Sequence, residues 1–317
     1  MNRTAVLVLV MCAAGAISTV SARQDRRARF RSTADAVMVD VQVKDRGKPV
    51  AGLTAADFEL RDSGVRQQIQ AFTFADVPLS VLLVLDVSDS VKGQPLQHLK
   101  DAAGSAVAAL RPNDQAALLV FSQRVHLKSG WTSDHAALAA AIGGIEAQGS
   151  TSLHDAVFTS VALRERAAGR PIAVVFTDGR DTMSWLGART TFDAALRSDV
   201  VFYAVSAAPP ETTVDTGNEK LGVMAPAKSP VKAFDSDPEL YPYGMLDKLT
   251  QQTGGELIRV QSTRDLSSVF ATIVTDFKTR YLLTYSPKGV PASGWHPLEV
   301  TLRGKRGKVT ARRGYTR

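Results

Sequence analysis

Short apolar runs alternate along most of this chain with segments whose apolar residues recur every three or four positions. From Val81 to Leu85 every residue is aliphatic, which is typical of a strand buried on both faces of a parallel sheet. The expected strands are Val81–Asp86, Ala116–Phe121, Pro171–Thr177, Val200–Ala207 and Gly255–Val260, with Val125–Leu127 as a short edge strand. The expected helices are Gln94–Leu110, Ser133–Ile145, Asp155–Arg166, Thr191–Arg197, Leu240–Gln252 and Asp265–Phe277. The alternation predicts an α/β fold with a doubly wound, mostly parallel sheet and helices on both faces.

Both ends of the chain carry short alternating strands instead. These are Val37–Val43, pieces of Leu60–Phe74, Arg280–Pro287, Leu298–Leu302 and Lys308–Arg312. Strands this short and few do not stand alone. We therefore expect the two ends to form one small β-rich flanking unit outside the main sheet, in which Val37–Val43 packs with Tyr281–Tyr285 or Leu298–Leu302.

The first 22 residues have the features of a secretory signal peptide: Arg3, an apolar stretch from Ala5 to Ile17, and small residues before a cleavage point after Ala22. A membrane anchor is the alternative, but the apolar stretch is short for a bilayer. Cys12, the only cysteine, lies in this segment, so the mature chain has no disulfide. We expect a secreted or periplasmic protein with no transmembrane helix in the mature chain.

Local changes in composition indicate how the rest of the chain divides into segments. A basic linker and the N-terminal β-rich segment occupy 23–76, the main domain 77–279, and the C-terminal β segment with its basic tail 280–317. Within the main domain, 208–238 is rich in proline and threonine and follows neither period, so an irregular insertion is expected there. The formal net charge is +7, but basic residues gather at both ends and leave an acidic body. No nucleic-acid partner is expected, while solvated basic ends leave envelope association open.

Polar side chains lie in three separate loops, two of which directly follow a buried strand. Asp86, Ser88 and Ser90 follow the first buried strand, Thr151 lies in a Gly-Ser-Thr-Ser turn, and Asp178 follows another buried strand. Ligands bind at the carboxyl ends of strands in open α/β sheets, and hydroxyl and carboxylate oxygens suit hard cations. The alternative is that each residue only caps a helix or stabilises a turn.

These motifs resemble the metal-ion-dependent adhesion site (MIDAS) of the von Willebrand factor A domain. The family begins its site with Asp-x-Ser-x-Ser, and Val174–Gly179 matches its second strand ending in Thr-Asp-Gly. The resemblance implies five metal ligands, Asp86, Ser88, Ser90, Thr151 and Asp178, around Mg²⁺ or else Mn²⁺ or Ca²⁺. It also implies a protein partner that presents an Asp or Glu to the ion. The sequences of the two β-rich flanking segments are similar to those of exported bacterial proteins with related domains.

Catalysis is not expected, and no residue is assigned to it or to an organic cofactor. The chain lacks the Gly-x-Ser-x-Gly, His-Glu-x-x-His, Gly-x-Gly-x-x-Gly and phosphate-loop motifs. His154 and Asp155 could be taken for a catalytic pair, but a helix cap or surface role is the commoner use. Asp89 and Asp181 either add negative potential at the rim of the site or are solvated. A metal-dependent hydrolase and a structural envelope protein remain as alternatives to an exported adhesion protein.

Overall fold

The computed structural model describes residues 36–75, 77–178, 181–207 and 244–317. The expected signal peptide, the basic residues that follow it and the expected insertion at 208–238 lie outside these ranges. All described residues belong to one compact unit, Asp35–Arg317. Within the described ranges, no helix combines the length and the apolar character needed to cross a bilayer.

A six-stranded sheet forms the centre of the main domain, and its order confirms the predicted doubly wound α/β fold. The order is β11 (Leu257–Arg259), β10 (Val201–Ser206), β9 (Arg170–Thr177), β6 (Leu79–Asp86), β7 (Gln115–Phe121) and β8 (Val125–Thr132). All neighbours are parallel except β7 and β8. Every residue of β6 and β9 is buried, because helices cover both faces of these strands.

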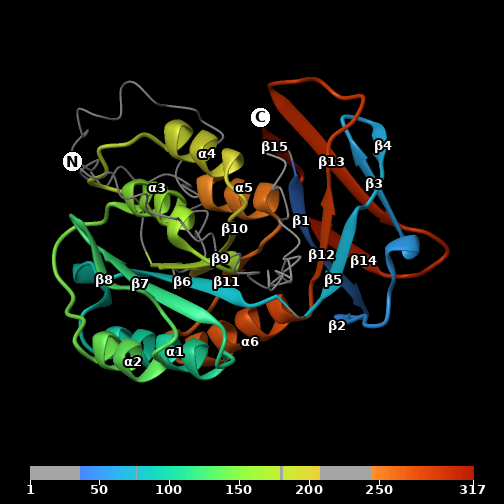
Figure 1. The fold of residues 1–317 in the computed structure, drawn as a ribbon. Coiled ribbons are helices and arrows are strands. Elements are labelled where there is room, and N and C mark those ends of the chain that lie inside the picture. Colours follow the sequence, from blue (N-terminus) through green and yellow to red (C-terminus); the bar gives the residue numbers. More distant parts are fainter. Residues whose placement is uncertain (1–35, 76, 179–180, 208–243) are drawn as a thin grey trace, which may run out of the picture. The chain divides into compact units, whose positions relative to one another are not determined.

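Two helical layers enclose this sheet (Figure 1). One consists of α1 (Gln94–Ala108), α2 (His135–Gly143) and α6 (Leu266–Lys278), and the other of α3 (Leu153–Leu163), α4 (Ala188–Arg197) and α5 (Gly244–Thr253). Alternate residues of β6 divide between the two cores, with Leu83 and Leu85 in the first and Leu82 and Val84 in the second. Single 3-10 turns lie at Ala55–Asp57, Asp89–Val91, Arg164–Arg166 and Thr263–Asp265.

The two ends of the described chain form one β unit, as predicted. One sheet has the order β14 (Lys308–Ala311), β1 (Val37–Asp45), β12 (Tyr281–Tyr285) and β5 (Ala71–Phe74), with β2 (Lys48–Pro49) on β1. The other has the order β15 (Gly314–Thr316), β13 (Trp295–Leu302), β3 (Phe58–Asp62) and β4 (Val65–Gln67). β1 and β12 are antiparallel, with Val37 opposite Tyr285 and Val41 opposite Tyr281. The expected pairing of Val37–Val43 with Tyr281–Tyr285 is therefore confirmed.

A fully buried carboxylate, Asp62, lies inside the β unit. It accepts hydrogen bonds from the hydroxyls of Tyr285 (2.8 Å) and Tyr315 (2.9 Å), and its other oxygen lies 3.0 Å from His296 Nδ1. Burial and this neighbouring carboxylate raise the pKa of the Tyr315 hydroxyl to about 12. The two tyrosines therefore remain protonated donors, which a buried carboxylate needs as partners.

Buried and half-buried polar contacts also join the β unit to the main domain. The guanidinium of Arg170, at the start of β9, donates to Asp40 on β1, with 2.8 Å from Nε to Oδ1. Lys44 on β1 forms an ion pair of 2.5 Å with Asp276 on α6. Helix α6 ends at Lys278 and β12 begins at Tyr281, so the last helix of the main domain is connected almost directly to the β unit.

Two expectations about local structure are wrong. The edge strand β8 extends to Thr132, well beyond the expected Leu127, because pairing with β7 supports a sequence that is largely exposed and lacks a clean alternation. The basic C-terminal end is not simply solvated. Arg312 is 9% exposed and donates to the carbonyl oxygens of Gly314 and Leu196, and β15 follows it, a strand that the sequence pattern does not reveal.

Candidate metal centre

Asp86 is the last residue of β6 and is completely buried. Its Oδ1 accepts a hydrogen bond from the backbone N–H of Ser88 at 3.0 Å, and its Oδ2 accepts one from the Thr177 hydroxyl at 2.7 Å. Thr177 ends the neighbouring strand β9. The carboxylate is thus fixed at the carboxyl edge of the sheet by contacts from two adjacent strand ends.

Burial raises the pKa of Asp86 to about 6, because removal from water disfavours the charged form. The hydrogen bonds from Ser88 and Thr177 act in the opposite direction, and the nearby charge of Asp178 adds to the rise. The hydrogen bonds therefore offset only part of the free-energy cost of burying the charged Asp86 carboxylate. A cation beside this carboxylate would offset that cost.

Hydrogen bonds connect Asp86 to three other predicted ligands. The hydroxyls of Ser88 and Ser90 lie 2.9 Å apart, and the Ser90 hydroxyl donates to Asp178 Oδ1 at 2.8 Å. Ser88 is buried, whereas Ser90 is exposed. The first loop and the end of β9 therefore present hydroxyl and carboxylate oxygens that contact one another.

The Thr151 turn is held beside the first loop by backbone contacts. Gly149 N–H donates to Asp89 Oδ1 at 2.9 Å, and Asp89 N–H donates to the Gly149 carbonyl at 2.8 Å. Gly149 has a φ of +79°, a conformation that favours glycine. Thr151 is 6% exposed, and the buried hydroxyl of its neighbour Ser152 has no hydrogen-bond partner within the described part of the chain. The structure thus brings the Thr151 turn to the same edge of the sheet as the other four predicted ligands.

A third loop, which follows Asp178, contacts the Thr151 turn. The N–H groups of Thr182 and Met183 donate to the Thr151 carbonyl at 2.9 and 3.0 Å. Asp155 accepts from the N–H groups of Trp185 and Leu186, both at 3.0 Å. As a result Trp185 projects with 87% of its surface exposed, and Met183 with 52%. This feature was not predicted from the sequence, although the loop contains three large apolar residues, Met183, Trp185 and Leu186.

The residues considered for catalysis or for the rim have structural partners. His154 Nδ1 lies 3.2 Å from the Leu186 carbonyl, and Asp155 organises the third loop. Asp181 accepts a hydrogen bond from the Ser184 hydroxyl and lies at 3.3 Å from His154 N–H. Asp89 is exposed and forms an ion pair of 2.7 Å with Lys92.

The set of donors fits a hard divalent cation. Within the described ranges, no group of three or more His, Cys, Asp or Glu residues is arranged to hold a metal, so a site built from imidazole or several carboxylates finds no support there. The predicted set instead combines three hydroxyls with the carboxylates of Asp86 and Asp178. Oxygen ligands of low total charge suit Mg²⁺, which retains water and prefers oxygen.

Comparison with known proteins identifies the same region. Residues 81–180 match the model of the von Willebrand factor type A domain. A protein of Synechocystis described as uncharacterised is 31% identical over 111 residues, which is 33% of this chain and 26% of the relative; the match thus spans about a quarter of that relative's length. A von Willebrand factor type A structure from Catenulispora acidiphila is similar over 89% of this chain and 72% of its own, with 10% identity and a TM-score of 0.50. Proximal thread matrix protein 1 from the mussel byssus, with a zinc-occupied MIDAS motif, is 15% identical over 68% of this chain and 49% of its own, with a TM-score of 0.48.

Proposed function

We propose that this chain, whose residues 81–180 belong to the von Willebrand factor type A family, is an exported, non-catalytic binding protein that holds a divalent cation and recognises an acidic residue of a protein partner through it. The observation that carries the proposal is a series of hydrogen bonds: the Ser88 backbone N–H donates to Asp86, the Ser88 and Ser90 hydroxyls lie 2.9 Å apart, and the Ser90 hydroxyl donates to Asp178. Its ligands would be Asp86, Ser88, Ser90, Thr151 and Asp178.

The donor set determines how a partner would bind. Neutral hydroxyls from Ser88, Ser90 and Thr151 would bind the ion directly, and the two aspartates would act mainly through water. Such an ion, Mg²⁺ or else Mn²⁺ or Ca²⁺, would stay electron-poor and would supply an open position for an incoming carboxylate. The negative charge of an Asp or Glu of another protein suits that position.

The third loop offers the partner an apolar contact beside the ion. Trp185 and Met183 are exposed on the segment whose backbone is bonded to Thr151 and Asp155. Large aromatic side chains on a fixed backbone often supply much of the binding energy at interfaces. We therefore propose that the partner's acidic residue is accompanied by an apolar surface that covers Trp185.

The proposed function is binding without catalysis. Hydrolysis at a bound metal would require a general base that can reach an activated water molecule. The two candidates, His154 and Asp155, lie at the start of α3 and have polar partners in the third loop. This use of their polar atoms supports binding as the function.

The test is partner capture from an envelope extract with the full mature chain, in Mg²⁺ and in parallel with a chelator. We expect a partner to be retained in Mg²⁺ and released by the chelator. Asp86→Ala should lose both metal and partner, because it removes the buried carboxylate. Trp185→Ala should bind metal normally and lose most partner binding. Trp295→Ala is a matched control, since Trp295 is 42% exposed on β13 of the β unit. Equal capture with chelator and with Mg²⁺ would contradict the proposal.

A further inference from the structure

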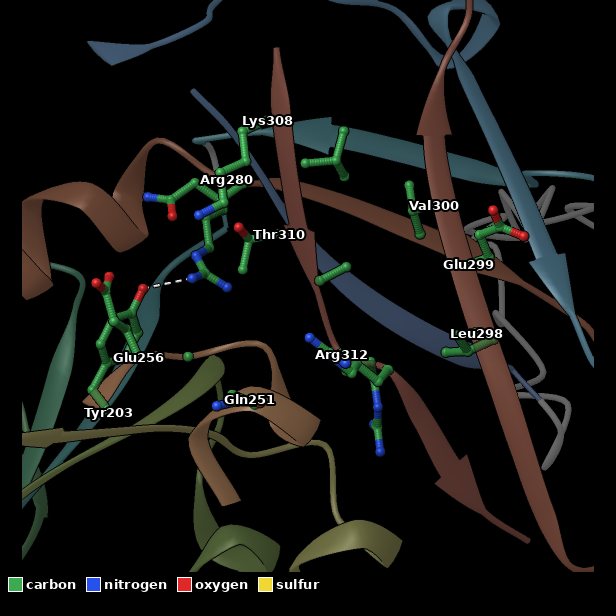
Figure 2. Close-up of a pocket in the computed structure, with 15 residues that line it drawn as sticks. Tyr203, Gln251, Glu256, Arg280, Leu298, Glu299, Val300, Lys308, Thr310 and Arg312 are labelled. Atoms are coloured by element: carbon green, nitrogen blue, oxygen red, sulfur yellow. Dashed lines mark hydrogen bonds between the residues drawn. The ribbon is translucent and has the colours of Figure 1, made fainter. Parts of the chain in front are cut away.

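A cavity of about 430 Å³ lies where α5, β10 and the turn before β11 meet β1, β13 and β14 of the β unit. Its lining includes Gln42, Tyr203, Glu256, Arg280, Lys308 and Arg312. Figure 2 shows the Arg280 side chain pointing toward Tyr203, with Lys308 on β14 and Arg312 just after the end of that strand. None of these residues belongs to the candidate metal centre.

Arg280 is a buried cation without an anionic partner. It is 1% exposed, and its guanidinium donates from Nη1 to the Gly254 carbonyl at 2.8 Å and from Nη2 to the Tyr203 hydroxyl at 2.5 Å. The Nε–H has no hydrogen-bond partner, and among the described residues no carboxylate forms an ion pair with this side chain. A buried charge is costly unless it is paired and fully hydrogen-bonded.

A second unpartnered donor lines the same cavity. Gln42, on β1, is 6% exposed, and its Nε2 has no hydrogen-bond partner in the described part of the chain. Buried polar groups are normally hydrogen-bonded, and each exception requires an explanation. Since both orphaned groups are N–H donors, the group that is missing from the cavity is an acceptor.

The charge of the lining favours an anionic acceptor. Lys308, Arg312 and Arg313 contribute cations in addition to Arg280, while the carboxylates are those of Glu256 and Glu299. Arg312 is buried as well, and its Nε and Nη2 donate to neutral carbonyl oxygens. Two buried guanidiniums on the walls of one cavity therefore donate hydrogen bonds only to neutral acceptors.

We propose that this cavity binds one small oxyanion, a carboxylate or phosphate compound, whose oxygens accept from Arg280 Nε and Gln42 Nε2. A volume of about 430 Å³ lies in the range of small-molecule sites and is too small for a folded partner. Charge-assisted hydrogen bonds to guanidinium are among the stronger polar contacts in proteins. The ligand would join the last strands of the β unit to the edge of the main sheet.

The experiment measures anion binding by the full mature chain, by calorimetry and thermal unfolding. Succinate and inorganic phosphate are the two probes, each compared with sodium chloride of equal ionic strength. We expect one of them to bind once per chain and to raise the melting temperature, because a ligand that binds only the folded state stabilises it. The two arms distinguish a carboxylate ligand from a phosphate ligand.

Two variants locate the binding. Gln42→Glu keeps the size of the side chain but places a carboxylate in the cavity, so it should abolish binding of the anion. Lys308→Gln, at an exposed position of the lining, should weaken binding by about twofold to fivefold. Lys288→Gln is the matched control: it removes the same charge from an exposed lysine of the β unit outside the lining, and binding should not change.

The other possible outcomes would contradict the proposed anion site. If neither probe stabilises the chain beyond sodium chloride, water fills the cavity and the proposal is wrong. If an anion binds but Lys308→Gln and Lys288→Gln weaken it equally, or Gln42→Glu binds it normally, the anion lies elsewhere. Should Gln42→Glu fail to fold, the comparison of the two lysine variants still decides between these outcomes.

Discussion

The ion pair between Asp40 and Arg170 should be one of the strongest single contacts between the β unit and the main domain. Both side chains are nearly inaccessible, at 9% and 4% exposure. Two guanidinium nitrogens, Nε and Nη2, donate to Asp40 Oδ1, and the guanidinium carbon lies 5.0 Å from the centre of the Phe277 ring. Asp40→Asn keeps the shape of the side chain but removes its charge, which leaves Arg170 buried without an anion.

The expected cost is about 3–5 kcal/mol of unfolding free energy, the usual penalty for removing one partner of a buried ion pair. Replacing both partners, with Asp40→Leu and Arg170→Met, should cost far less than the sum of the single changes, because neither charge then remains in the interior. Asp45→Asn is the control, since Asp45 lies on the same strand and is exposed; it should change stability by less than about 0.5 kcal/mol.

Equilibrium unfolding in urea, followed by circular dichroism, measures these differences. A loss of less than about 1 kcal/mol for Asp40→Asn would place the pair in the range of solvent-exposed ion pairs. That result would refute the inference that a buried charge pair holds β1 against the start of β9.

Three further results are expected. Asp62→Asn should destabilise the chain by about 3 kcal/mol in urea unfolding, because an amide cannot accept all the hydrogen bonds from Tyr285, Tyr315 and Ser63 that the carboxylate accepts; an effect within error would contradict this role. In the metal-free protein, the pKa of Asp86 rises from 3.8 to about 6 on folding, so its contribution to stability is fully present below pH 3.8 and is lost as the pH rises through about 6. The loss amounts to about 3 kcal/mol, and Asp86→Asn should remove this part of the pH dependence of unfolding. Helix α6 should show little change in hydrogen exchange when an acidic peptide binds in Mg²⁺, because Lys44 and the short connection to β12 restrain it; a large change in protection there would show that the helix moves.

The main sheet could be predicted from the sequence because its strands are buried on both faces. In β6 and β9 nearly every residue must be apolar, so a single run indicates both the strand and its environment. The positions of Asp86 and Asp178 at the ends of such runs followed directly. The pairing of the chain ends could be predicted for a different reason, namely that the few strands at each end, such as β1 and β12, cannot stand alone and require partners.

Other features depend on contacts between residues that are far apart in the sequence. Asp40 and Arg170 are separated by 130 positions, and nothing near either residue marks it as part of a buried pair. Strand β15 has only three residues, too few for a periodic pattern. The exposure of Trp185 follows from the hydrogen bond between its backbone N–H and Asp155, a residue of helix α3. The ligand set remains a prediction, supported by the hydrogen bonds among four of its members.

The most direct test of the central claim is calorimetric titration of the metal-free, mature chain with Mg²⁺, and with Mn²⁺ in parallel. The account predicts one divalent ion per chain, a higher melting temperature in its presence, and complete loss of binding in Asp86→Ala with the fold retained. Asp101→Ala is the matched control, because Asp101 is an exposed carboxylate on α1 whose side chain accepts a hydrogen bond from Gln97; this variant should still bind the ion. No detectable binding of either ion to the wild-type chain would contradict the account.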